Sequence, residues 1–150
     1  MTAWLDIIPS EIAQSERDGG YAQLGHGMYS VVSSLKKDDW IVYYSPRERL
    51  GDGDKVEALT AIGRVKSRWP YEVQRPTGIS VYRVKVSFIE DARQAPFAPL
   101  ANQLQLTRRH ELDWKLIVRG GLREISIADL QIIAKAMGVQ LDTSGSRAGS

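Results

Sequence analysis

The chain has 150 residues, with 20 Lys and Arg, 18 Asp and Glu, and no cysteine. These numbers favour a single domain, exclude disulfides, thiolate metal sites and a cysteine nucleophile, and suit a reducing compartment. No apolar run approaches the roughly 20 residues of a membrane span, and the first residues lack a signal-peptide pattern. We therefore expect a cytoplasmic protein. The net charge of +2 is too small to indicate nucleic-acid binding by itself.

The start of the chain predicts a strand followed by a short helix. Residues 4–8 form an apolar run that ends at a proline, which favours a strand. Ser10 is expected to cap a helix that ends at Gly19-Gly20, with Ile12 as its main apolar anchor.

Three further strands are predicted in the middle of the chain. Residues 40–45 are apolar on both faces, which is typical of a central strand, and Pro46 is expected to end it. Residues 55–69 predict a long strand, in which Gly63 indicates a bulge or a close backbone approach. Residues 79–88 alternate between apolar and polar side chains, the pattern of a half-buried strand.

The last third predicts one or two strands within residues 112–125 and then a helix. Ser126, three residues before an aspartate, forms a capping box that begins this helix, and Gly138 closes it. We assign residues 1–140 to one domain and predict that residues 141–150 form a disordered tail. Strands with long hairpin loops and short helices indicate an α+β domain around a curved sheet or barrel.

The sequence contains no convincing catalytic or metal-binding constellation. His26 and His110 lie far apart and lack metal-ligand spacing, and neither a nucleophile elbow nor a phosphate-binding loop is present. The segment 51–54 (GDGD) lies between two predicted strands and is interpreted as a hairpin turn. We therefore expect no enzyme, no cofactor and no metal.

Polar side chains in a glycine-rich loop, residues 19–27 (GGYAQLGHG), are the first candidates for ligand binding. Gln23 and His26 offer an amide and an imidazole that can read the edge of a planar molecule. The alternative is that they satisfy buried backbone groups of a tight loop. Aromatic side chains offer flat surfaces for stacking, or belong to the core; these are Trp4, Tyr43, Tyr44, Trp114 and the segment 69–71.

Four segments together resemble the EVE domain (UPF0310-type proteins), a branch of the PUA-like superfamily related to YTH and ASCH domains. The segments are 19–27, 38–47 (DDWIVYYSPR), 59–65 (LTAIGRV) and, after Asp113-Trp114, 119–125 (RGGLREI). The resemblance extends from about residue 4 to residue 137. Three positions depart from the family pattern, namely Asp38 and Lys115 in place of glycine and Arg123 in place of an aromatic residue.

The resemblance implies an α+β, PUA-like curved β-barrel with short peripheral helices and a pocket that accepts a modified base. In such a pocket Gln23, His26 and Ser45 would hydrogen-bond a base edge or a phosphate, and Arg119 would pair with an anionic oxygen. Trp4, Tyr21 or Trp114 would stack on the base. The positions carried over from the family motifs are Gln23, His26, Gly27, Ser45, Pro46, Trp114 and Arg119.

These observations lead to one main hypothesis, a non-catalytic module that recognises a modified base in DNA or RNA. A pocket for a free nucleotide, nucleobase or carboxylate metabolite is the alternative, and it is favoured by the small net charge. A third hypothesis, an enzyme with His26 as general base, rests on one loop histidine. An exposed strand edge would allow a homodimer.

Overall fold

The computed structural model describes residues 1–110 and 112–141. The predicted tail therefore lies outside the described residues from position 142 onward. The strands are β1 (Ala3–Ile7), β2 (Tyr21–Ala22), β3 (Trp40–Arg49), β4 (Asp52–Val65), β5 (Tyr71–Gln74), β6 (Ser80–Phe88), β7 (Ala95–Pro96) and β8 (Leu122–Ile125). The helices are α1 (Ser10–Gly19), α2 (Tyr29–Val32) and α3 (Ile127–Ala136), with 3-10 turns at Leu24–Gly27, Ala98–Leu100, Arg108–His110 and Trp114–Leu116.

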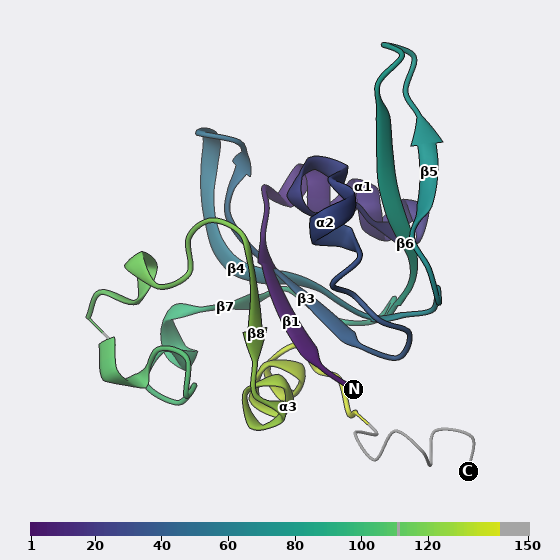
Figure 1. Cartoon of the computed structure of the whole chain (residues 1–150). Helices are drawn as coiled ribbons and strands as arrows, with labels where there is room; N and C mark the ends of the chain where they lie inside the picture. Colours follow the sequence, from purple (N-terminus) through teal and green to yellow (C-terminus); the bar gives the residue numbers. More distant parts are fainter. Residues whose placement is uncertain (111, 142–150) are drawn as a thin grey trace.

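The strands of the described residues form one mixed sheet in the order β2-β6-β4-β3-β1-β8, with β5 paired to β6 and β7 to β4. β1 runs parallel to β3, and the other pairs are antiparallel. The sheet curls into an open half-barrel, from which the β5–β6 hairpin extends (Figure 1). This arrangement confirms the predicted α+β fold with a curved sheet and short helices.

β3 lies at the centre of the sheet and is covered on both faces, as its sequence predicts. Ile41 and Tyr43 pack into a core with side chains of α1 and α2. Trp40, Val42 and Tyr44 pack into a second core with α3 and the chain between β7 and β8. Alternate side chains of one strand thus bind the two layers together.

The prediction that Pro46 ends this strand is wrong, because β3 continues to Arg49. The pairing with β4 shifts register between Ser45 and Arg47, so Pro46 occupies an irregular position of the ladder. A missing N–H is tolerated at such a position. The following strand is displaced from its predicted position, since β4 covers Asp52–Val65 rather than residues 55–69, and most of the predicted turn 51–54 belongs to it.

The predicted close approach at Gly63 is confirmed. A Cβ at this position would lie 2.7 Å from Cγ1 of Val86 and 2.9 Å from the carbonyl oxygen of Ser87 on the neighbouring strand. Only glycine allows the backbones of β4 and β6 to pack this closely.

α1 differs from its prediction at its start and agrees at its end. Pro9 occupies the N-cap, no side chain caps the first turn, and Ser10 is already helical. Ile12 is 46% exposed, whereas Ala13 and Glu16 face the core. Gly20 ends the helix in the left-handed conformation (φ 71°). α1 therefore contributes a buried glutamate to the core, where an apolar side chain was expected.

α3 begins as predicted, because Oγ of Ser126 accepts a hydrogen bond from the backbone N of Asp129 (3.0 Å). The Asp129 carboxylate turns away from the helix and accepts from the backbone N of Gln105 (2.7 Å) and of Leu106 (3.0 Å). α3 thereby holds the long connection that precedes β8. Within the part of the chain that the structure describes, no helix has the length and apolarity to cross a membrane.

Candidate functional site

Two adjoining hollows lie where β1 ends. We call the smaller one, about 300 Å³, the polar pocket; its walls include Asp6, Ile8, Ile12, Glu16, Gln23 and His26. We call the larger one, about 750 Å³, the basic cleft; its walls include Arg47, Arg49, Lys55, Glu57, Lys115 and Arg119. Both hollows share a wall, made of Ile7, Ile8, Pro9, Leu50 and Gly120.

Asp6 is the most unusual group of the polar pocket. The alternation along β1 places it on the face that packs against α1, where it is only 4% exposed. Its Oδ2 atom has no hydrogen-bond partner among the described residues. Burial, followed by the nearby charge of Glu16, raises the pKa of the Asp6 carboxyl from 3.8 to about 7. The backbone hydrogen bond with Ile7 lowers this pKa only in part. A buried carboxyl oxygen without a partner is costly, so its presence calls for a functional reason.

Glu16, the second buried carboxyl, is well satisfied. Its Oε1 accepts hydrogen bonds from the hydroxyl of Tyr43 and from the backbone N of Gln23 (3.2 Å for the latter). Burial raises the pKa of Glu16, and these hydrogen bonds partly oppose the rise. Glu16 therefore fixes the loop that carries Gln23, while Oδ2 of Asp6 has no hydrogen-bond partner among the described residues.

The loop after β2 forms the rim of the polar pocket. Three successive residues have positive φ, namely Gly25 (57°), His26 (59°) and Gly27 (81°). For a non-glycine residue such as His26 this conformation is strained, and strain of this kind is concentrated at functional sites. Oε1 of Gln23 accepts from Nε of Arg83 (2.8 Å), which leaves the Gln23 amide nitrogen without a partner among the described residues.

The structure brings four of the sequence-predicted site residues to the two hollows. Gln23 and His26 line the polar pocket, and Pro46 and Arg119 line the basic cleft. Gly27 is buried below the rim. A Cβ there would lie 2.6 Å from the Cβ of Val81, so Gly27 is required by packing.

Trp114 and Ser45 do not reach either hollow, so the structure corrects the roles expected for them. The Trp114 ring is 7% exposed and stacks on Phe97, with 4.8 Å between the ring centroids. Ser45 is fully buried, and its Oγ lies 2.8 Å from Oγ1 of Thr60. Both side chains belong to the core. Ser45 is a buried residue of β3, and Trp114 lies in a 3-10 turn, where its ring packs against Tyr44 and Phe97.

The other two aromatic candidates are occupied by intramolecular contacts. Nε1 of Trp4 donates to Oδ2 of Asp39 (3.0 Å), and the ring packs against the α1 core. The guanidinium of Arg83 lies 3.8 Å from the centroid of the Tyr21 ring and covers one of its faces. Neither residue lines the polar pocket or the basic cleft.

Sequence reasoning missed the two carboxyls of the polar pocket, Asp6 and Glu16. Asp6 stands inside an apolar run on a strand that is covered on both sides, and a charged residue at such a position signals a buried charge. Glu16 gives no comparable signal, because an exposed helical glutamate has the same local sequence.

Two of the three departures from the family pattern have a local explanation. Asp38 adopts a positive φ of 73° and so fills a turn position that suits glycine, which aspartate tolerates. Nη1 of Arg123 donates to the backbone O of Ile117 (2.6 Å) and fixes the loop that leads to the basic cleft. Lys115, the third departure, lines the basic cleft itself and pairs with Glu57.

The cations of the basic cleft differ in what they contact. Nζ of Lys115 lies 2.8 Å from Oε2 of Glu57, the one acidic residue among the described residues that line this cleft. Lys55 and Arg119 are exposed and have no ion-pair partner among the described residues. These two side chains are therefore available to an anion.

The remaining two cations are anchored at the β3–β4 turn. Nη1 of Arg47 donates to the backbone O of Gly53 (2.9 Å). Arg49 makes long ion pairs with the exposed carboxylates of Glu11 (3.6 Å) and Asp52 (3.5 Å). Exposed pairs of this length are weak, so Arg49 retains most of its positive field.

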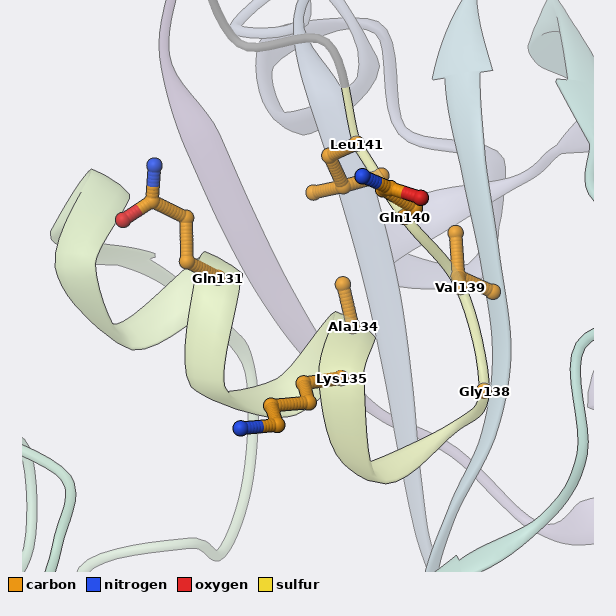
Figure 2. A pocket seen from close by; sticks show the side chains of 7 residues that line it. All are labelled: Gln131, Ala134, Lys135, Gly138, Val139, Gln140 and Leu141. Atoms are coloured by element: carbon orange, nitrogen blue, oxygen red, sulfur yellow. The ribbon is translucent and has the colours of Figure 1, made fainter.

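A further groove, of about 430 Å³, lies between α3 and the segment 138–141 that runs back beside it (Figure 2). None of the sequence-predicted site residues lines it. Among the described residues, no group of three or more His, Cys, Asp or Glu side chains is arranged to hold a metal ion. The polar pocket and the basic cleft are therefore the best candidates for a binding site.

The curled mixed sheet with its short helices defines an α+β domain of the PUA-like class. The solved structure of Rpa0253 from Rhodopseudomonas palustris has a similar fold, with a TM-score of 0.58 and 14% identity over 95% of this chain and 97% of that chain. The profile of the EVE domain matches residues 3–136, and the chain belongs to this family.

Relatives of similar length support this assignment. A UPF0310 protein from Mycobacterium avium is 32% identical over 137 residues, which cover 91% of this chain and 98% of the relative. The UPF0310 protein in the gntR 5' region of Bacillus licheniformis is 37% identical over 121 residues, which cover 79% and 80%. YdcG, a UPF0310 protein of Bacillus subtilis, is 31% identical over 138 residues, which cover 92% of this chain and 93% of the relative.

Proposed function

We propose that this protein is a non-catalytic binding module that holds one modified base of DNA or RNA in the polar pocket. The observation that carries the proposal is the buried Asp6 carboxyl, whose Oδ2 has no partner in a pocket that also presents Gln23 and His26. A base supplies the donors and acceptors that such a carboxyl lacks.

The pocket has the size and polarity for a single planar ring. Its volume of about 300 Å³ lies at the lower end of the range for small-molecule sites. The Asp6 carboxyl accepts a hydrogen bond when ionised and also donates one when protonated, and the Gln23 amide donates. Ile8 and Ile12 line the same pocket, so an alkyl group added to a base would meet apolar side chains.

Catalysis is not part of the proposal because His26 hydrogen-bonds to no carboxylate among the described residues. A general base needs a partner that orients its ring and holds its tautomer. We expect the wild-type protein to leave a bound oligonucleotide chemically unchanged, which mass spectrometry of the strand after incubation will measure.

A pocket for a free small molecule is the second candidate function. The net charge of +2 favours it, because the chain as a whole does not attract a polyanion strongly. Both functions use the same pocket, and they differ in whether the rest of a nucleic-acid strand adds affinity.

The test is a fluorescence and calorimetric titration with matched 12-mers. Each pair differs in one central base, for example N6-methyladenine against adenine or 5-methylcytosine against cytosine, in single and double strands. We expect one modified strand to bind about tenfold more tightly than its unmodified twin, the scale of one methyl group in a fitted pocket. If every pair binds equally, the proposal is wrong, and binding of free nucleosides alone selects the second candidate.

The Gln23→Ala variant tests the pocket directly. We expect it to weaken binding of the preferred strand by about tenfold, because it removes the free amide donor and the partner of Arg83. Gln74→Ala, an exposed change on β5, is the matched control and is expected to leave the affinity unchanged. Equal losses in both variants would place the binding site elsewhere.

A further inference from the structure

We infer that the basic cleft is an anion subsite that binds the phosphate attached to the nucleotide whose base lies in the polar pocket. The assignment of the base rests on the proposed function. The assignment of the anion rests separately on the charge and geometry of the cleft.

The cleft concentrates positive charge that the chain as a whole does not have. Five of the 20 Lys and Arg side chains line it, against one carboxylate among the described lining residues, while the net charge of the chain is only +2. Clefts with walls of one sign focus the electrostatic potential and attract ions of the opposite sign. The five cations are Arg47, Arg49, Lys55, Lys115 and Arg119.

The order of the surfaces matches the order of groups in a nucleotide. The polar pocket offers hydrogen-bonding groups, the shared wall with Ile7, Ile8 and Pro9 is apolar, and the basic cleft is cationic. A nucleotide has a hydrogen-bonding base, a sugar with an apolar face and an anionic phosphate in the same order. A ligand that enters the pocket with its base therefore directs its phosphate to the cleft.

Glu57 marks the place where an anionic oxygen fits. It lies in β4 opposite the irregular pairing of Ser45 and Arg47, and its φ of 48° is unfavourable for a residue with a side chain. β-bulges of this kind commonly redirect a side chain toward a site. Its carboxylate stands 2.8 Å from Nζ of Lys115, as a phosphate oxygen would.

Lys55 and Arg119 are the cations that the phosphate is expected to meet first. Both are exposed and have no ion-pair partner among the described residues, and both line the same cleft as the Lys115–Glu57 pair. Replacing Lys55 and Arg119 by neutral residues removes the two unpaired cations of the cleft. Neutralising Glu57 frees a third cation, Lys115, from its ion pair. The two changes are therefore expected to act in opposite directions.

The experiment measures binding of an unmodified ten-residue oligothymidylate at several salt concentrations between 50 and 200 mM. We expect a Lys55→Gln/Arg119→Gln variant to bind roughly tenfold more weakly at the lowest salt. The slope of log K against log salt should become shallower by about 0.7, because the two cations hold one phosphate and each single-strand phosphate contact contributes about 0.7. Glu57→Gln keeps the side-chain shape and is expected to bind about threefold more tightly.

A Lys37→Gln/Lys135→Gln variant is the matched control. It lowers the net charge by the same amount at exposed positions outside the cleft. If this control weakens binding as much as the cleft variant does, or if Glu57→Gln leaves the affinity unchanged, the anion subsite is wrong. Thermal unfolding of each variant verifies that the exposed substitutions leave the fold intact.

Thymidine 5′-monophosphate distinguishes the two sources of phosphate. If the cleft variant loses as much affinity for the monophosphate as for the oligonucleotide, the subsite binds the phosphate of a free nucleotide. Weakening of the oligonucleotide alone assigns it to the diester backbone. The ratio between modified and unmodified strands should not change in the cleft variant, so a failure of base selectivity is separable from a failure of the anion subsite.

Discussion

Asp6→Asn is expected to make the protein more stable at pH 8 and unable to bind its ligand. The pKa of the Asp6 carboxyl rises from 3.8 to about 7 on folding. At about 1.4 kcal/mol for each pKa unit, the ionised carboxylate costs the fold roughly 4 kcal/mol. An unpaired asparagine amide retains roughly half of that cost, so we expect a net gain of about 2 kcal/mol.

The gain has a defined pH window. Below pH 3.8 the carboxyl is protonated in both the folded and the unfolded chain, and folding releases no proton. Between pH 3.8 and about 7 the unfolded chain has lost this proton while the folded chain keeps it, so the wild type loses stability as the pH rises. Above pH 7 both states are ionised, and the advantage of the variant remains constant.

Thermal unfolding of both proteins at pH 4.5 and pH 8 checks this expectation. At pH 8 the variant should unfold at a temperature higher by roughly 6 °C, and at pH 4.5 the difference should nearly vanish or change sign. Asp18→Asn at the exposed end of α1 is the control and should shift stability by less than about 0.5 kcal/mol at both pH values. A variant less stable than the wild type at pH 8 would show that Asp6 is structural.

Loss of binding together with a gain in stability would identify Asp6 as a functional residue. Natural proteins keep destabilising groups at sites where activity needs them. Glu16 does not have this character, since Tyr43 and the backbone of Gln23 satisfy its carboxylate. The two buried carboxyls of the polar pocket thus have different roles: Glu16 fixes the loop at the rim, and Asp6 is expected to bind the ligand.

The fold was largely predictable from the sequence because burial on both sides leaves a clear pattern. The apolar residues on both faces of β3 indicated a central strand, and the alternation of β6 indicated its buried face. Pro46 was misleading because a proline signals the end of a strand unless the ladder is irregular there, and a register shift is set by the neighbouring strand rather than by local sequence.

The site was predictable only in part because it combines residues from distant segments. The family motifs pointed to Gln23, His26, Pro46 and Arg119, which do line the two hollows. Trp114 looked equally suitable, but a tryptophan in a core and one in a ligand cage have the same local sequence. Asp6 was missed although its place inside an apolar run signals a buried charge. Glu57 was missed because its unusual backbone angle appears only in three dimensions.

Gly27→Ala is expected to have the largest effect on stability. The residue has a φ of 81°, which costs a side-chain-bearing residue roughly 1 kcal/mol. The new Cβ would also lie 2.6 Å from the Cβ of Val81, and overpacking of this kind costs roughly 2 kcal/mol. We therefore expect a loss of about 3 kcal/mol in the free energy of unfolding, measured by urea unfolding at 25 °C.

Gly78→Ala is the matched control, because Gly78 has a similar φ of 86° and no atom within 4 Å of the position of a new Cβ. It should lose only about 1 kcal/mol, the cost of the backbone conformation alone. The difference between the two variants isolates the contact with Val81 across the rim of the polar pocket. If both variants lose the same stability and only Gly27→Ala loses binding, Gly27 serves the ligand directly, and the rim is not held by the packing described above.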